Sequence, residues 1–282
     1  MKKLLVPTDF SDEAYQAIDV AAYIAKKICA EVVLFNVLEN FDEIIEQKGV
    51  KYKIDETEQM NALTSMKVKL MSIEKSLRKS GVRAKSEVEL DFEHLSADVA
   101  EVITKRDDCD LIVMGSKGAH GIKEYFIGSN TEKVVEKAHV PVLAVKKYNP
   151  DFKIENVLFP TDFVEYSETV VKFVRQFSND FNAKLHLLYI NIPKYFLDEK
   201  EIELYFDKFK LKFGIENCTT HSYSAHKEED GILTFAEKLG ADVIFMPTNG
   251  RTGLSKLING SVTSSSINHG NIPILTINTN HI

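Results

Sequence analysis

The sequence has few cysteines, no long apolar run and no excess of positive charge. Its three cysteines, Cys29, Cys109 and Cys218, are far apart and lack metal-ligand spacing, a pattern typical of a reducing cytoplasm. No apolar run approaches the roughly 20 residues of a membrane-spanning helix. The net charge is −7 and both halves of the chain are acidic, which argues against a nucleic-acid-binding surface. We therefore expect a cytoplasmic globular protein without a nucleic-acid or membrane partner.

Several nucleotide and catalytic motifs are also missing. No Gly-Lys-Ser/Thr of a Walker loop occurs, and the first loop is Pro-Thr-Asp-Phe-Ser (7–11) where a dinucleotide fingerprint would stand. The same loop lacks the Ser-Gly-Gly-x-Asp-Ser pattern of pyrophosphatase-type ligases. His120 has no identifiable carboxylate to orient it, and the other seven histidines are scattered without ligand spacing. No catalytic residue and no metal site is predicted, so binding is favoured over turnover.

The stretch from Met114 to Thr131 contains four glycines, Gly115, Gly118, Gly121 and Gly128, and follows an apolar strand. Glycine lets backbone N–H groups turn toward a ligand without a Cβ in the way. Ser129, Asn130 and Thr131 then stand at a helix start, where free N–H groups and the helix dipole attract an anion. Lys117 could add a point charge. This stretch predicts a phosphate cradle.

The chain repeats itself. Pro7-Thr8-Asp9-Phe10 recurs as Pro160-Thr161-Asp162-Phe163, an offset of 162 − 9 = 153 residues, whereas the glycine loops are offset by 250 − 118 = 132. The second copy is therefore shorter by 21 residues (153 − 132), lost between the two loops. Two copies of this length predict two domains, 1–147 and 153–282, joined by a polar linker.

Strands alternate with helices in both copies. Apolar segments at 3–6, 31–38 and 111–114 read as strands, and the spacing of Ala14, Ile18 and Ala21 predicts a helix that Ser11 caps. The alternation predicts α/β domains, each with an open, doubly wound, five-stranded parallel sheet. Ligands of such sheets bind outside the carboxyl ends of the strands. Asp9 and the glycine loop are both expected on that edge.

With the segments VPTDFS (6–11), VVLFNV (32–37), LIVMGSKG (111–118) and GSNTEKVVEKAHVPVLAV (128–145), the chain resembles the universal stress protein family, specifically its tandem members. The resemblance covers nearly the whole length. It implies an adenine-nucleotide alpha-hydrolase-like fold and ATP as the ligand, which Mg²⁺ or Mn²⁺ could accompany. In nucleotide-binding members the aspartate matching Asp9 contacts the nucleoside. The implied binding residues are Pro7, Thr8, Asp9, Val37, Met114, Gly115, Lys117, Gly118, Gly128, Ser129, Asn130 and Thr131, with Asp162, Gly250, Gly260, Ser261 and Thr263 as weaker candidates in the second domain.

The two halves are expected to differ in function. Pro247 stands where the first copy has Gly115, and proline has no N–H to offer a phosphate. The resemblance also implies that the apolar terminal strands 140–145 and 272–277 pair as an internal pseudo-dimer, and a homodimer of chains could add to it. Two alternatives remain open: a nucleotide-independent protein-interaction module of the same fold, and a slow ATPase.

Overall fold

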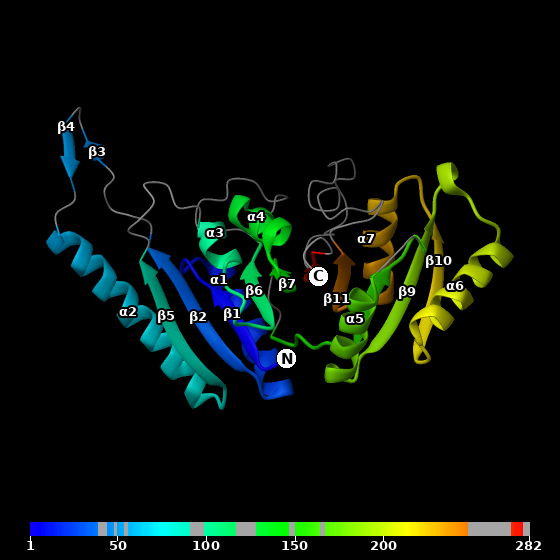
Figure 1. Cartoon of the computed structure of the whole chain (residues 1–282), viewed down its shortest axis with the longest axis horizontal. Helices are drawn as coiled ribbons and strands as arrows, with labels where there is room; N and C mark the ends of the chain where they lie inside the picture. Colours follow the sequence, from blue (N-terminus) through cyan, green and yellow to red (C-terminus); the bar gives the residue numbers. More distant parts are fainter. Residues whose placement is uncertain are drawn as a thin grey trace.

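The computed structural model describes residues 1–38, 44–47, 50–53, 56–90, 99–116, 128–146, 150–163, 167–247 and 272–278 (Figure 1). In the first half the elements are β1 (Lys3–Pro7), α1 (Asp12–Ile28), β2 (Glu31–Leu38), β3 (Ile44–Gln47), β4 (Val50–Lys53), α2 (Glu56–Lys79), β5 (Arg83–Leu90), α3 (Val99–Thr104), β6 (Leu111–Gly115), α4 (Ser129–Lys137) and β7 (Val142–Val145). In the second half they are β8 (Asn156–Pro160), α5 (Glu168–Phe181), β9 (Lys184–Asn191), the 3₁₀ turn η1 (Pro193–Tyr195), α6 (Glu199–Phe213), β10 (Cys218–Ser224), α7 (Glu228–Leu239), β11 (Val243–Pro247) and β12 (Ile274–Ile277).

Ten of these strands form one sheet in the order β10-β9-β8-β11-β12-β7-β6-β1-β2-β5. All neighbours are parallel except β12 and β7, which pair antiparallel. The predicted α/β fold with a mostly parallel, doubly wound sheet is confirmed. Strands β3 and β4 form a separate antiparallel hairpin within residues 39–58, where the sequence alone predicts no element.

Helices cover both faces of the sheet. One apolar cluster joins the strands to α1, α2, α5 and α6 and runs through both halves of the chain. The other cluster lies on the opposite face, under α3, α4 and α7. Because β6 and β11 are buried at every position, their sequences read as continuous apolar runs without alternation.

The repeat extends to the backbone conformation. Positive φ occurs at Phe10 and Phe163, and again at Cys29 and Asn182, which end α1 and α5. Each pair is separated by 153 residues (163 − 10 and 182 − 29). Helix α1 begins as the sequence predicts, because the Ser11 hydroxyl accepts a hydrogen bond from the backbone N–H of Ala14.

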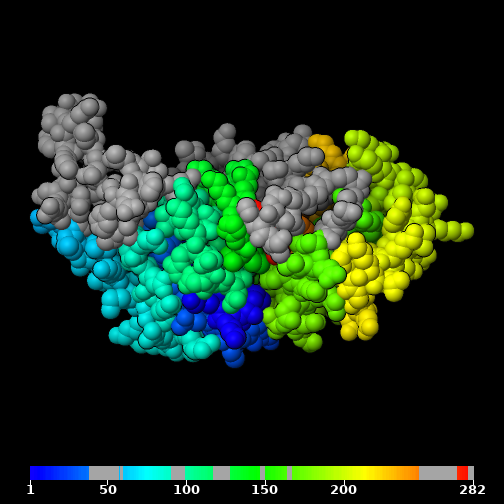
Figure 2. Space-filling view, viewed as in Figure 1, coloured from blue at the N-terminus to red at the C-terminus, as the bar shows by residue number. Residues whose placement is uncertain are grey.

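The two halves also meet outside the sheet. The backbone N–H of Ile154 donates to the hydroxyl of Tyr23 on α1 at 3.1 Å. The Tyr23 ring centroid lies 5.3 Å from that of Phe152 and 6.2 Å from that of Phe181 on α5. In the space-filling view the first half (blue to green) and the second half (lime to yellow) touch along the middle of the molecule (Figure 2).

Candidate functional site

The loops that the sequence singles out leave the sheet side by side. Strands β1 and β6 are parallel neighbours, with Leu4 paired to Leu111 and Leu5 to Ile112. After β1 the chain continues through Thr8 and Asp9, and after β6 through Ser116. The strand order reverses here, because β2 lies on one side of β1 and β6 on the other. Such a reversal at the carboxyl edge is where doubly wound sheets bind ligands.

The loop after β1 is held by its own polar groups. The backbone N–H of Thr8 donates to the Phe35 carbonyl at 2.8 Å, and the Thr8 hydroxyl accepts from the N–H of Phe10 at 3.1 Å. The carboxylate of Asp9 accepts from the N–H of Ser11 at 3.0 Å and from its hydroxyl at 2.5 Å. Asp9 therefore orients the serine that caps α1, and it does so while its side chain is exposed at the edge of the sheet.

Gly115 is required by packing against α1. A Cβ added there would lie 2.8 Å from the carbonyl carbon of Glu13 and 2.9 Å from its oxygen. Real Cβ atoms do not approach backbone that closely, so only glycine fits at the end of β6. The sequence predicts that this glycine lets a backbone N–H face a phosphate. In the structure, glycine is needed at this position because a Cβ would clash with the backbone of Glu13.

The start of α4 lies against the end of β6. The hydroxyl of Thr131 donates to the Gly115 carbonyl at 2.8 Å, and the backbone N–H of Gly128 donates to the Ser116 carbonyl at 2.6 Å. Thr131 is buried, whereas Ser129 and Asn130 are exposed in the first turn. Of the three polar residues predicted to meet an anion, Thr131 thus uses its hydroxyl hydrogen inside the chain.

The remaining predicted residues fall into two groups. Pro7 and Met114 lie in β1 and β6, and Val37 lies half-buried near the end of β2. Outside the described residues are Lys117, Gly118, Gly250, Gly260, Ser261 and Thr263, as is His120, for which no catalytic role is predicted.

The corresponding edge of the second half is more enclosed. Asp162 is 8% exposed and Ile190, which corresponds to Val37, is 4% exposed. The side chain of Asn191 donates to the Leu197 carbonyl at 2.8 Å and accepts from its N–H at 3.1 Å. The segment after β9 is thereby tied to the end of that strand, and Pro247 ends β11 where β6 ends at Gly115.

A polar cluster that the sequence does not reveal lies on β8, β9 and β10. His186 Nδ1 lies 3.1 Å from His221 Nε2 and 2.6 Å from the Thr219 hydroxyl, and His186 Nε2 lies 3.2 Å from Asn156 Oδ1. An amide oxygen only accepts, so His186 carries its proton on Nε2 and accepts at Nδ1. Burial lowers the pKa of both histidines, and at His186 the neighbouring His221 and Lys184 lower it further. Parallel strands bring these residues together although 35 positions separate the two histidines.

This cluster predicts acid sensitivity. A lowered pKa in the folded state means that the unfolded chain binds more protons, so the free energy of unfolding should fall as pH decreases below about 6.5. Urea unfolding at pH 7.5, 6.5 and 5.5 measures the slope of the free energy of unfolding against pH. We expect this slope to be smaller in His186→Leu than in the wild type. His226→Leu is the control, because His226 is exposed. Equal slopes in wild type and His186→Leu would contradict the prediction.

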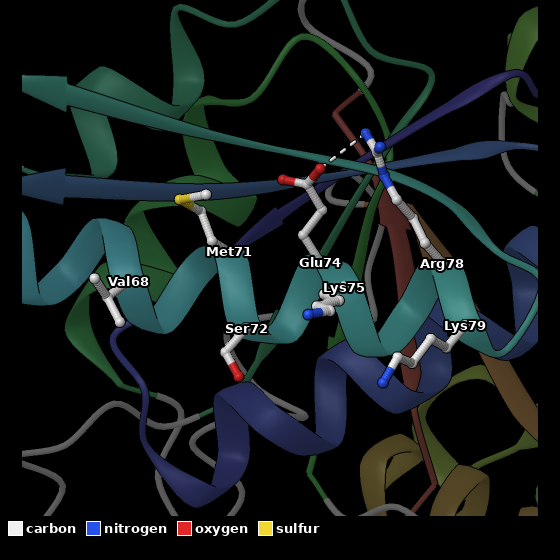
Figure 3. A pocket seen from close by; sticks show the side chains of 7 residues that line it. All are labelled: Val68, Met71, Ser72, Glu74, Lys75, Arg78 and Lys79. Atoms are coloured by element: carbon white, nitrogen blue, oxygen red, sulfur yellow. Dashed lines mark ion pairs between the residues drawn. The ribbon is translucent and has the colours of Figure 1, made fainter.

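A surface hollow of about 750 Å³ lies elsewhere, on α2. Figure 3 shows the side chains that line it, all from this one helix; Glu74 and Arg78 form an ion pair at 2.8 Å, and Val68 and Met71 are exposed. Among the described residues, those that line this hollow all belong to α2 and none belongs to the carboxyl edge.

The part of the chain that the structure describes contains no group of three His, Cys, Asp or Glu side chains placed to hold a metal ion. In the same part, none of the helices combines the length and apolar character needed to cross a bilayer.

Comparison with known proteins gives a consistent result. The family model "Universal stress protein family" matches residues 1–146 and 192–278. Universal stress protein MJ0577 of Methanocaldococcus jannaschii is 32% identical over 161 residues, covering 52% of this chain and 96% of its own. Universal stress protein Slr1230 of Synechocystis sp. is 22% identical over 302 residues, covering 98% and 99%. A crystal structure of a universal stress protein from Archaeoglobus fulgidus, 20% identical, covers 98% of both chains with a TM-score of 0.69 and so shares the fold. The chain belongs to the universal stress protein family.

Proposed function

We propose that this universal stress protein is a nucleotide-binding protein of the cytoplasm that holds ATP in its first domain. The observation that carries the proposal is the exposed carboxylate of Asp9, located where the strand order reverses and beside the end of β6. A carboxylate at that place can accept hydrogen bonds from ribose hydroxyls, while the loop that begins after Ser116 supplies glycine N–H groups to phosphates. A divalent cation such as Mg²⁺ or Mn²⁺ would accompany the phosphates.

The difference in exposure between the halves supports binding in the first domain. Asp9 is exposed, whereas its counterpart Asp162 is 8% exposed. Val37 is half-buried, whereas Ile190 is 4% exposed. A ligand reaching the second edge would have to displace groups of the chain itself, which costs free energy before any contact is made.

We also propose that the two domains, 1–147 and 153–282, form an internal pseudo-dimer in solution. The antiparallel pairing of β7 with β12 and the contacts of Tyr23 support this arrangement. In this arrangement the carboxyl edge that carries Asp9 and the one that carries Asp162 belong to different domains of one chain.

Calorimetric titration of ATP with Mg²⁺ into matched variants tests the nucleotide proposal. In Asp9→Asn the amide oxygen can still accept from Ser11, so α1 stays capped while the negative charge is lost. Losing a charge-assisted hydrogen bond costs about 1.5–3 kcal/mol, so ATP should bind roughly ten- to a hundredfold more weakly. Asp162→Asn is the matched control and should leave the affinity unchanged.

The outcomes separate the alternatives. Loss of binding in Asp162→Asn alone would place the ligand in the second domain, and two equal sites in the wild type would contradict the asymmetry. Absence of ATP binding in the wild type, together with no nucleotide in mass spectra of the denatured purified protein, would favour the interaction module. Release of phosphate by the wild type would identify a slow ATPase.

A further inference from the structure

Helix α6 carries two exposed leucines on the side away from the core. Leu204 is 52% exposed, and Leu211 is 86% exposed, the largest fraction among the large apolar side chains of the described residues. Seven residues are close to two helical turns, so the two leucines lie on one line along the helix. The opposite side, with Ile202, Phe206 and Phe209, is buried. Two aligned leucines in water form the kind of apolar stripe through which helices pack on one another.

The position of α6 leaves this stripe open. Figure 1 shows the helix at the outer end of the second half, remote from the seam where β7 pairs with β12. In the space-filling view the yellow end of the molecule, to which this part of the chain belongs, is not covered by the first half (Figure 2). The contact between the two halves therefore uses a different surface.

The charges of α6 are divided along its length. Residues 199–207 carry a net charge of −3, from four acidic residues and one lysine, and residues 208–213 carry +3, from three lysines. Asp207 and Lys210 form an ion pair at 2.8 Å where the two parts meet. An antiparallel helix of the same sequence would place each acidic part against a basic part, whereas a parallel one would oppose like charges.

A twofold axis between Leu204 and Leu211 produces this antiparallel arrangement. Leu204 of each copy then faces Leu211 of the other copy, so both leucines of both copies become buried together. Such an interface uses the same surface on each copy, and it is complete with two copies. The apolar stripe and the divided charges thus fit the same partner, which is a second copy of this helix.

We propose that α6 is a homodimer interface, in which it packs antiparallel against α6 of a second copy of this chain through Leu204 and Leu211. The surface is separate from the carboxyl edge that carries Asp9, so the inference does not depend on nucleotide binding. A contact between two helices of 15 residues, each about 22 Å long, is smaller than a standard interface of about 1,600 Å². We therefore expect a reversible dimer that forms at micromolar concentrations.

Sedimentation velocity of the full chain over a concentration series tests the leucines. Wild type should pass from monomer to dimer as the concentration rises. Leu204→Ser and Leu211→Ser each remove an apolar contact from both copies, so each should raise the dissociation constant of the dimer at least about tenfold. Met71→Ser is the matched control, because Met71 is 63% exposed on α2, and it should associate as wild type does.

Two charge-reversal variants test the direction of packing. Glu199→Lys with Glu203→Lys makes both parts of α6 basic, and Lys208→Glu with Lys212→Glu makes both parts acidic. All four side chains are exposed, and the changes leave the capping box and the internal ion pair of the helix in place. Each variant alone should dimerise more weakly than wild type, because its two parts repel those of an antiparallel copy. An equimolar mixture of the two variants should associate again.

Each result has one meaning. Weaker dimers in both serine variants, with association restored in the charge-reversal mixture, would support the inference. A wild type that stays monomeric at several hundred micromolar, or a dimer that the serine variants leave unchanged, would overturn it. Tighter dimers of the single charge-reversal variants would indicate parallel packing and would also overturn it. If a serine variant fails to fold by circular dichroism, the charge-reversal variants decide.

Discussion

Gly115→Ala is expected to lower the free energy of unfolding by about 1–3 kcal/mol, the usual cost of overpacking. The added Cβ would lie 2.8 Å from the backbone carbonyl carbon of Glu13, and main-chain atoms in a helix cannot rotate out of the way. Strand β6 or the first turn of α1 must shift, which would disturb the loop after β1 as well. Urea denaturation followed by circular dichroism measures the change.

Gly231→Ala provides the comparison. Its added Cβ would also meet an atom at 2.8 Å, the Cβ of Ala225, but its other near contacts at 2.9 and 3.1 Å belong to the side chain of Ile190, which can change rotamer. We expect Gly231→Ala to lower the free energy of unfolding by less than Gly115→Ala does. An unchanged stability of Gly115→Ala would show that the end of β6 has room for a side chain and that the glycine serves another purpose.

Leu275→Ala is expected to destabilise the chain by about 2–5 kcal/mol. Leu275 is fully buried in β12 and is paired in register with Leu143 of β7, where the two halves join. Removing its side chain leaves a cavity in an apolar cluster that includes residues of both halves. Equilibrium unfolding with a probe in each half would show both transitions moving together.

A double-mutant cycle with Leu143→Ala measures the coupling across the seam. Residues in contact show interaction free energies of about 0.5–3 kcal/mol, whereas independent sites add. We expect the double variant to lose less free energy of unfolding than the two single variants lose together. Strict additivity, with separate unfolding of the two halves, would contradict the internal pseudo-dimer.

The fold class follows from local patterns in the sequence. Continuous apolar runs such as 111–114 need burial on both faces, and helices with a cap at Ser11 and an apolar stripe must cover the sheet, so the alternation leads to an α/β fold. The repeated Pro-Thr-Asp-Phe loops determined the tandem organisation, and the structure reproduces them with the same backbone conformation at Phe10 and Phe163. These features are local, so they can be read from neighbouring residues.

The sequence also predicted that Asp9 and the end of β6 share one edge, because parallel strands place their carboxyl ends together. It predicted neither the hairpin of β3 and β4 nor the burial of Asp162, whose motif is identical to that of Asp9. Burial depends on what the rest of the chain brings to that edge, and no local pattern records it.

Which polar groups have partners depends on contacts between distant parts of the chain. The lack of a Cβ at Gly115 is explained by Glu13 of α1, and His186 meets His221 only through the register of β9 and β10. The same is true of Asn36, whose Nδ2 donates to the Thr8 carbonyl and whose Oδ1 has no hydrogen-bond partner among the described residues. Composition and spacing determine which elements form; the approach of distant backbones and side chains determines which of their polar groups remain for a ligand.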